Sequence, residues 1–202
     1  MYVRDAKNRE EVWLLDHIEA MELDDTAFRS RDYVVAVDEQ SGEKAGFGRI
    51  RVHKTDAETV TDDGRDGEIC ELTSIGVLEG WREQGVGAHV VERLVEYAAD
   101  QGFETVYTLT GEGGYLTQFG FRRIEESQLP EALRERLSDK RDGVDPDAVP
   151  LSIDVDEFEM PDRHREAFKR APEGRNEPSN DETPEDFGID PDSTTYKYDT
   201  GR

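Results

Sequence analysis

The feature that most constrains the fold is a strand-like segment that passes, through closely spaced glycines, into an amphipathic helix. Residues 69–77 are rich in β-branched and apolar side chains, and Gly85 and Gly87 follow a turn at positions 79–80. From about Gly87 onward the apolar residues share one helical face and comprise Val90, Val91, Leu94, Val95, Ala98 and Ala99. Because a helix with one apolar stripe packs on a sheet, this unit predicts helices layered on strands.

Segments on both sides of this unit extend it into a larger sheet. Alternating or β-branched patterns predict strands at residues 2–4, 33–37, 45–52, 69–77, 105–109, 121–124 and 151–158. Helical patterns are expected after Asn8 and over residues 87–101, 113–119, 130–137 and 162–171. Since strands and helices alternate in the centre, we expect a partly parallel sheet with helices covering it.

The first helix has its own start signal. Asn8 can cap it, with Glu11 placed three residues later as in a capping box. Apolar residues at roughly helical spacing should give the helix its inward face, namely Val12, Leu15, Ile18 and Met21.

The chain divides into one domain and a polar tail. Its 202 residues suffice for one substantial core and are few for two full domains. We expect a domain at residues 1–171, with a core at 1–126 and a strand-and-helix extension at 127–171. Residues 56–67 are polar and should form a surface loop. Residues 172–202 have almost no apolar side chains and are expected to be an acidic, disordered tail.

The charge balance is strongly acidic, with 49 Asp and Glu residues against 25 Lys and Arg residues and a formal net charge of -24. Low apolar content with high net charge is typical of disorder, but the patterned centre restricts that explanation to the chain ends. The second explanation is adaptation to high salt, since molar salt shortens the screening length to roughly 3 Å and removes most self-repulsion. Lysines are few, and the dominance of arginine resembles the composition of halophilic archaeal proteins.

The same composition limits partners and compartment. Binding to nucleic acid or to an anionic membrane surface needs clustered Lys and Arg, and the chain has no such cluster. Cys70 is the only cysteine, and the sequence shows neither a signal pattern nor a long apolar run, so we expect a cytoplasmic protein. The histidines are scattered, so no metal is expected; they are His17, His53, His89 and His164.

Residues 81–88, Trp-Arg-Glu-Gln-Gly-Val-Gly-Ala, are suited to hold a phosphate. A chain that enters a helix through glycines exposes successive N–H groups at the positive end of the helix dipole, and a Cβ would keep phosphate oxygens away from them. Arg82 can add a positive charge. A dinucleotide fold would need a third glycine where Val90 stands, and a Walker loop would need Gly-Lys-Ser/Thr. The alternative interpretation is that Gly85 and Gly87 only make a tight turn.

A family resemblance rests on this segment and three others. Arg82-x-x-Gly85-x-Gly87-Ala88 resembles the Arg/Gln-x-x-Gly-x-Gly/Ala signature of the GNAT superfamily of N-acetyltransferases. The other matching segments, in order, are similar to the family's fourth strand, its following helix, and its late helix with a Phe-Gly-Phe turn: residues 71–77, 88–101 and 115–121.

This resemblance covers residues 1–124 and carries expectations for the fold. It implies an α/β (α+β) architecture, with a mixed, mostly antiparallel central sheet that contains a parallel central pair and is flanked by helices. Leu109-Thr110, the 115–121 segment and Leu129-Pro130 are most similar to the N-acetylglutamate-synthase-like branch.

The resemblance also implies an acetyl-CoA site without metal. The pyrophosphate would lie beside Arg82 on backbone N–H groups of a short run: Gln84, Gly85, Val86, Gly87 and Ala88. Backbone groups of Ile75 and Val77 would bind the pantetheine arm where the fourth strand splays from its neighbour. Strand alternation would place Glu71 and Thr73 on the same face as Ile75 and Val77.

Two catalytic candidates follow from the same resemblance. Glu71 stands where some family members place the base that deprotonates the amine, and desolvation beside Cys70 and Leu72 would favour its neutral form. The alternative is an ordinary edge residue. The family's general acid is a tyrosine four residues before the Gly of the Phe-Gly-Phe turn, where this chain has Leu116. Tyr115 is the adjacent candidate, but one residue turns a helical side chain by about 100°, so a core or pocket-wall aromatic is the alternative.

The function implied is transfer of an acetyl group from acetyl-CoA to a small-molecule or peptide amine by direct attack; a homodimer is compatible with the sequence. Two alternatives stay open. One is a GNAT-like module that binds acyl-CoA or a partner without turnover, which Leu116 favours. The other is an interaction protein whose acidic tail is the functional part.

Overall fold

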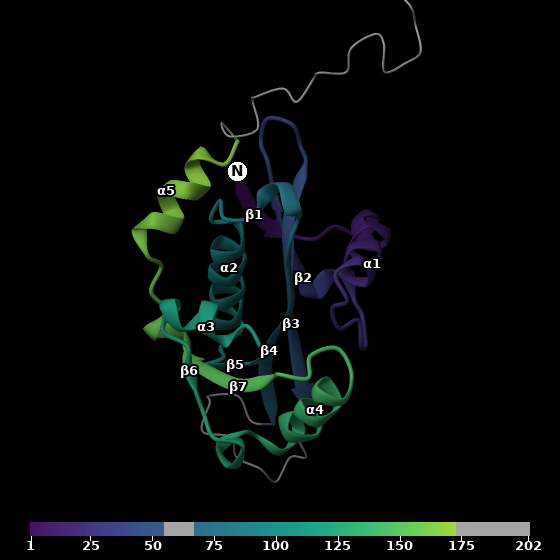
Figure 1. The fold of residues 1–202 in the computed structure, drawn as a ribbon, viewed down its shortest axis with the longest axis vertical. Helices are drawn as coiled ribbons and strands as arrows, with labels where there is room; N and C mark the ends of the chain where they lie inside the picture. Colours follow the sequence, from purple (N-terminus) through teal and green to yellow (C-terminus); the bar gives the residue numbers. More distant parts are fainter. Residues whose placement is uncertain (55–66, 173–202) are drawn as a thin grey trace, which may run out of the picture.

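A seven-stranded sheet forms the centre of the protein, in the order β1-β2-β3-β4-β5-β7-β6 (Figure 1). The computed structural model describes residues 1–54 and 67–172. The strands are β1 (Tyr2–Asp5), β2 (Tyr33–Val37), β3 (Lys44–Lys54), β4 (Glu68–Val77), β5 (Thr105–Thr110), β6 (Arg122–Arg123) and β7 (Val149–Asp154). β4 and β5 are parallel and the other neighbouring pairs antiparallel, which confirms the mixed sheet with one parallel central pair.

Helices cover both faces of this sheet. Figure 1 shows α2 (Val86–Asp100) and α5 (Asp162–Arg170) on one side, and α1 (Glu11–Ala20) and α4 (Glu131–Asp142) on the other. The short α3 (Gly113–Leu116) follows β5. Single 3-10 turns connect these elements at Asn8–Glu10, Ser30–Asp32, Glu79–Trp81, Thr117–Phe119, Glu126–Gln128 and Val155–Glu157. Within the described residues, none of the helices has the length and apolar character needed to span a membrane.

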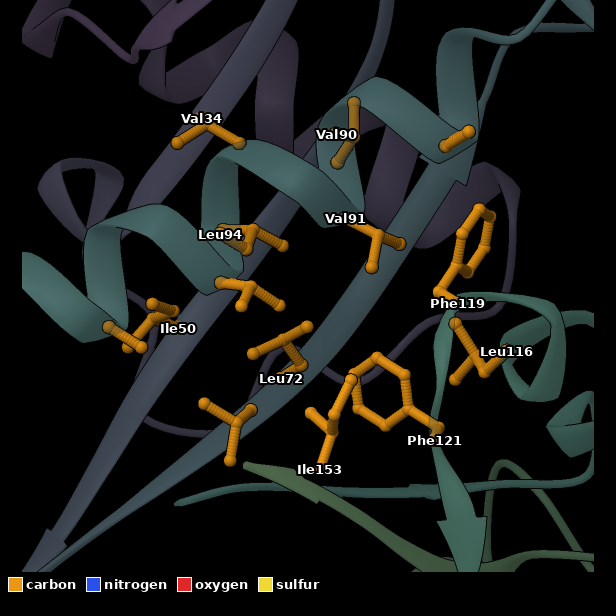
Figure 2. Packing of buried hydrophobic residues seen from close by; sticks show 14 of the residues in the cluster. Val34, Ile50, Leu72, Val90, Val91, Leu94, Leu116, Phe119, Phe121 and Ile153 are labelled. Carbon is orange, nitrogen blue, oxygen red and sulfur yellow. The ribbon is translucent and has the colours of Figure 1, made fainter. Parts of the chain in front are cut away.

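The face under α2 carries the largest apolar core. Figure 2 shows Val90, Val91 and Leu94 of α2 directed at strand residues such as Leu72. Phe119, Phe121 and other side chains from the second half of the chain complete the cluster. Burial of this apolar surface is the main stabilising contribution expected for such a domain.

The opposite face carries two smaller apolar clusters. One joins α1 to β2 and β3, and comprises Leu14, Ile18, Tyr33, Val35, Val37 and Phe47. The other joins α4 to β4 and β5, and comprises Ile69, Leu109, Leu129, Leu133, Leu137 and Ala148. This face also holds buried charged side chains, among them Arg49, Glu71, Arg136 and Lys140.

The inward face of α1 differs from the prediction. Leu14 and Ile18 are buried, whereas Val12 is 69% exposed and Leu15 is 36% exposed. The predicted positions are three residues apart, and three residues turn an α-helix by only about 300°, so positions 12, 15 and 18 drift off one face. Glu10, and not Glu11, accepts the backbone N–H that a capping box satisfies, from Lys7 at 2.8 Å.

Two predicted segments fall largely outside the described residues. The loop expected at residues 56–67 is described only at its last position, and the tail expected at 172–202 only at its first. The division into a domain and a disordered tail therefore stays a prediction.

Candidate functional site

A cavity opens where β4 and β5 part. Their parallel pairing ends at Leu72 and Thr108, although β4 continues to Val77 and β5 to Thr110. A cavity of about 920 Å³ lies beyond that point, within the usual range for ligand pockets. Its wall is formed by the ends of β4 and β5, the loop after α1, and the glycine segment, residues 81–88, that leads into α2. Later elements also contribute residues, among them Tyr115, Lys140 and His164.

A bulge in β4 shapes this wall. Thr73 pairs with Arg49 and Gly76 with Phe47, so two β4 residues stand opposite one residue of β3. Ser74, at the bulge, has a left-handed backbone with φ of 51°. Its hydroxyl donates a hydrogen bond of 2.6 Å to the backbone oxygen of Asp24 in the loop after α1.

The bulge overturns the prediction that Glu71, Thr73, Ile75 and Val77 share one face. Ile75 and Val77 pack with the α2 cluster, and Val77 lies beside Gly87. Glu71 and Thr73 instead meet residues of α4, on the opposite face. The inserted residue reverses the alternation, so both faces of β4 contribute to one cavity.

The glycine segment forms the start of α2. Gly85 has φ of +75°, and a Cβ there would lie 2.4 Å from the backbone oxygen of His164, so only glycine fits. At Gly87 a Cβ would lie 3.3 Å from both Tyr115 Oη and Val77 Cγ2, in the cavity wall. The first N–H groups of a helix have no intrahelical acceptor, and they lie at the positive end of its dipole.

Most of the residues predicted to bind the cofactor lie together on this wall. The cavity is lined by Ile75, Val77, Arg82, Gly85, Val86 and Gly87. Arg82 Nε donates to the backbone oxygen of Val77 at 3.5 Å, which joins the glycine segment to the end of β4. The side chains of two other predicted residues point elsewhere: Ala88 is in the α2 core, and Gln84 Nε2 donates to the Gly80 backbone oxygen at 3.0 Å.

Tyr115 also lines the cavity. Its ring contacts Phe119 edge to face, with 5.3 Å between the ring centroids, and 40% of the residue stays exposed. Burial raises the pKa of Tyr115, and the positive charge of Arg163 opposes that rise. Leu116, at the position where the family has its tyrosine, is 5% exposed and packs in the apolar core.

Glu71 lies behind the cavity wall and not on it. Its side chain is fully buried, and Oε2 lies 2.7 Å from His53 Nε2 and 3.4 Å from Arg136 Nε. Lys140 Nζ lies 3.7 Å from Glu71 Oε1. The carboxylate therefore lies among nitrogen-bearing side chains, two of them cationic, rather than in the purely apolar environment that its strand neighbours suggested.

Lys140 connects this buried group to the cavity that it lines. Its Nζ donates to Thr73 Oγ1 at 3.1 Å and to the Leu109 backbone oxygen at 2.8 Å. Burial lowers the pKa of Lys140, and the negative charge of Glu71 partly opposes this. Lys140 thus contacts both Glu71 and Thr73 and joins the buried carboxylate to the cavity wall.

Part of the cavity wall is formed by the loop after α1, which buried groups hold in place. Arg49 donates to the backbone oxygens of Thr26 at 2.8 Å and Ala27 at 2.6 Å. Asp24 receives a hydrogen bond from Arg136. Because its main chain is fixed at several points, this loop gives the cavity a defined wall.

Arg136, Lys140 and His53 were missed as site residues in the sequence. A signal for two of them was present, because Arg136 lies on the helix predicted at 130–137 and Lys140 follows four residues later, on the face that carries Leu133 and Leu137 once the helix continues to Asp142. Charged residues at core positions of a helix indicate buried partners. His53 had no such signal, since its contact with Glu71 arises only from strand pairing.

The N-terminal part of the chain, up to residue 121, matches a known protein family. The sequence model of the Acetyltransferase (GNAT) family matches residues 2–121, more than half of the chain. An uncharacterized N-acetyltransferase of Chlorobaculum tepidum, CT2212, is 29% identical over 66 residues, which are 33% of this chain and 43% of that protein. The chain therefore spans less than half the length of this curated relative.

Solved structures share the fold at low sequence identity. Rv2747 from Mycobacterium tuberculosis, in complex with CoA and NLQ, has a TM-score of 0.59 at 16% identity, covering 76% of this chain and 99% of that one. N-acetylglutamate synthase from Neisseria gonorrhoeae, complexed with coenzyme A and N-acetyl-glutamate, has a TM-score of 0.56 at 16% identity, covering 76% and 34%. A putative arylalkylamine N-acetyltransferase from Aedes aegypti has a TM-score of 0.52 at 14% identity, covering 76% and 86%.

Proposed function

Since the chain belongs to the acetyltransferase (GNAT) family, we propose that it transfers an acetyl group from acetyl-CoA to a primary amine by direct attack. The observation that carries this proposal is the cavity between the separated ends of β4 and β5. Its wall includes a helix start with two glycines, and also a fixed loop and a buried lysine that lies beside a carboxylate. The helix start suits an anionic cofactor, and the lysine with its carboxylate suits proton removal from an acceptor.

The residues present fit a coenzyme A molecule. Gly87 lies in the cavity wall between Tyr115 and Val77, where a Cβ would project toward the cofactor, and Arg82 lies on the same wall. At Gly85 the Cβ position is taken by the backbone oxygen of His164. Ile75 and Val77, beyond the last β4–β5 pair, would offer backbone groups to an extended pantetheine arm. Acetyl-CoA would supply the activated acetyl thioester.

We assign deprotonation of the amine to Glu71 acting with Lys140. Glu71 does not line the cavity, so it acts through a group that does. Because burial lowers the pKa of Lys140, its ammonium gives up a proton more readily than that of an exposed lysine, and the amine that results can accept one from the substrate. In this proposal the proton passes from the substrate amine to Lys140 Nζ, and the Glu71 carboxylate stabilises the ammonium that forms 3.7 Å away.

Tyr115 is the proposed general acid for the departing thiolate. Its hydroxyl lies at the cavity wall beside Gly87, near the proposed path of the cofactor. A phenol is protonated at neutral pH, and burial, which raises the pKa of Tyr115, keeps it so, as a proton donor requires. The proposal thus gives its two proton-transfer roles to Lys140 with Glu71 and to Tyr115.

The acceptor is proposed to be a small-molecule or peptide amine. Solved proteins of this fold include one complexed with N-acetyl-glutamate and a putative arylalkylamine N-acetyltransferase. A cytoplasmic location, adaptation to high salt, a homodimer and a place in the N-acetylglutamate-synthase-like branch stay predictions from the sequence.

An amine screen tests the function. Purified protein in molar KCl, given acetyl-CoA and a panel of amino acids, arylalkylamines and peptides, should release free thiol in step with acetylated product for at least one acceptor. Gly87→Glu, which places a carboxylate at the phosphate end, should abolish acetyl-CoA binding in calorimetry. Unchanged binding by that variant would mean that the cradle lies elsewhere.

The second candidate is an acyl-CoA-binding module without turnover, favoured by Leu116 at the position of the family's tyrosine. Tight acetyl-CoA binding without acetylation of any amine in the panel would support it. Thiol release with any acceptor would exclude it.

A further inference from the structure

Helix α5 lies directly against the proposed phosphate end of the cavity, although it follows the residues that match the family. The backbone of His164 passes over Gly85 so closely that a Cβ there would lie 2.4 Å from its oxygen. Phe168 is 7% exposed and stacks on His89 of α2, with 3.8 Å between the ring centroids. This packing fixes α5 beside the start of α2 and places His164 in the cavity wall.

α5 is cationic in a chain whose net charge is -24. Most of its cations have acidic partners: Arg165 lies 2.7 Å from Glu92, while Lys169 and Arg170 lie 2.9 and 3.7 Å from Glu166. Arg163 differs, because it donates to the neutral amide oxygen of Gln118, an oxygen that His164 also approaches. Its charge is therefore held in place without being neutralised by that contact.

Arg163 lies beside the cavity wall. It shares Gln118 Oε1 with His164, which lines the cavity, and Gln118 Nε2 donates to the backbone oxygen of Tyr115 at 2.7 Å. Arg82 lies on the cavity wall on the β4 side of the glycine segment. The site thus has one arginine from the glycine segment on its wall and one from α5 next to its wall.

We propose that Arg163, held by Gln118, binds a pyrophosphate oxygen of coenzyme A opposite Arg82, so that α5 is a third wall of the cofactor site. Guanidinium groups form short charge-assisted hydrogen bonds with phosphate. This inference rests on the proposed function, because it takes coenzyme A as the ligand. It adds to that function a binding residue contributed by the extension after the family core.

The test is calorimetric binding of CoA and of 3′-dephospho-CoA to the full chain at one fixed KCl concentration. Arg163→Met keeps most of the aliphatic stem and removes the charge. It should weaken both ligands by the same factor, about tenfold, as expected for one charge-assisted contact that is partly exposed. The matched control is Arg165→Met, on the same helix but paired with Glu92, which should leave both affinities within about twofold. Melting curves establish that each variant is folded.

Several outcomes would overturn the proposal. A loss for CoA but not for 3′-dephospho-CoA would assign Arg163 to the 3′-phosphate, and equal losses in both variants would assign the effect to the general field of the helix. Unchanged affinity with a lowered melting temperature would leave Arg163 as a structural partner of Gln118. Failure of the parent protein to bind either ligand would reject the proposed function itself, whereas parent binding with an unchanged Arg163→Met variant rejects only this inference.

Discussion

On the α2 face of β4, Cys70 and Leu72 join the apolar core, whereas on the α4 face of the same strand Glu71 and Thr73 meet Arg136 and Lys140. The apolar face gains stability from burial that needs no particular partner geometry. The charged face removes several ions from water, which is costly unless every partner is in place. Successive residues of one strand thus lie in two different environments, one apolar and one charged. The bulge at Ser74 brings both faces of β4 to one cavity.

The largest effect should come from the charged face, through catalysis. Glu71→Gln should lower the acetyl-transfer rate by roughly 10²–10⁴-fold near neutral pH, because the proton acceptor loses its stabilising carboxylate. Acetyl-CoA affinity should stay nearly intact, since the cofactor wall belongs to other residues. The loss should shrink as pH rises, because more of the substrate amine is already neutral.

Rates over a pH series, with the folded fraction measured for each variant, provide the check. Glu96→Gln, an exposed acid on α2, serves as the control and should behave as the parent does. Parent-like rates for Glu71→Gln at every pH would leave Glu71 as a structural residue of its strand.

The next largest effect should be on the free energy of unfolding, and it should differ between the two faces of β4. Leu72→Ala should lower the free energy of unfolding by about 2–5 kcal/mol through a cavity. Glu71→Gln should lower it by about 3–5 kcal/mol, because Arg136 and Lys140 stay buried without their anion. Adding Lys140→Met should recover part of the Glu71→Gln loss and none of the Leu72→Ala loss.

Denaturant titrations of the single and double variants measure this coupling. Simple additivity of Glu71→Gln and Lys140→Met would contradict the view that the charged face acts as one network.

The smallest effect concerns a second buried acid on the α1 and α4 side. Hydrogen bonds from Arg4 lower the pKa of Glu10 from its ordinary 4.5 to about 2. Since the folded pKa lies below the unfolded one, the stability contributed by this pair is complete above pH 4.5 and is lost as pH falls toward 2. Glu10→Gln should cost about 2 kcal/mol at pH 7 and progressively less in acid.

Melting temperatures of parent and Glu10→Gln between pH 7 and pH 3 test this prediction. The gap between the two curves should narrow as pH falls, and a constant gap would show that Glu10 contributes by packing alone.

Much of the fold could be predicted from local patterns, because the strand at 68–77, the glycine segment and α2 each carry a signal within a few residues. The bulge could not, since Ser74 adopts a left-handed backbone that its residue type does not announce. For the same reason Glu71 was placed on the cofactor side. Arg136 and Lys140 contact residues of β4, some 65 residues earlier in the chain. The pattern within one helix indicates that these side chains are buried, but it does not identify such distant partners.

The loop after α1 is held in place mainly by hydrogen bonds to its backbone oxygens. Arg49 and Ser74 bind the carbonyl oxygens of Thr26, Ala27 and Asp24, groups that every amino acid possesses. Substitution along this loop can therefore alter the surface offered to the acceptor while the path of the backbone persists. Under the proposed function, single replacements here would change which amines are accepted, without rebuilding the scaffold that presents them.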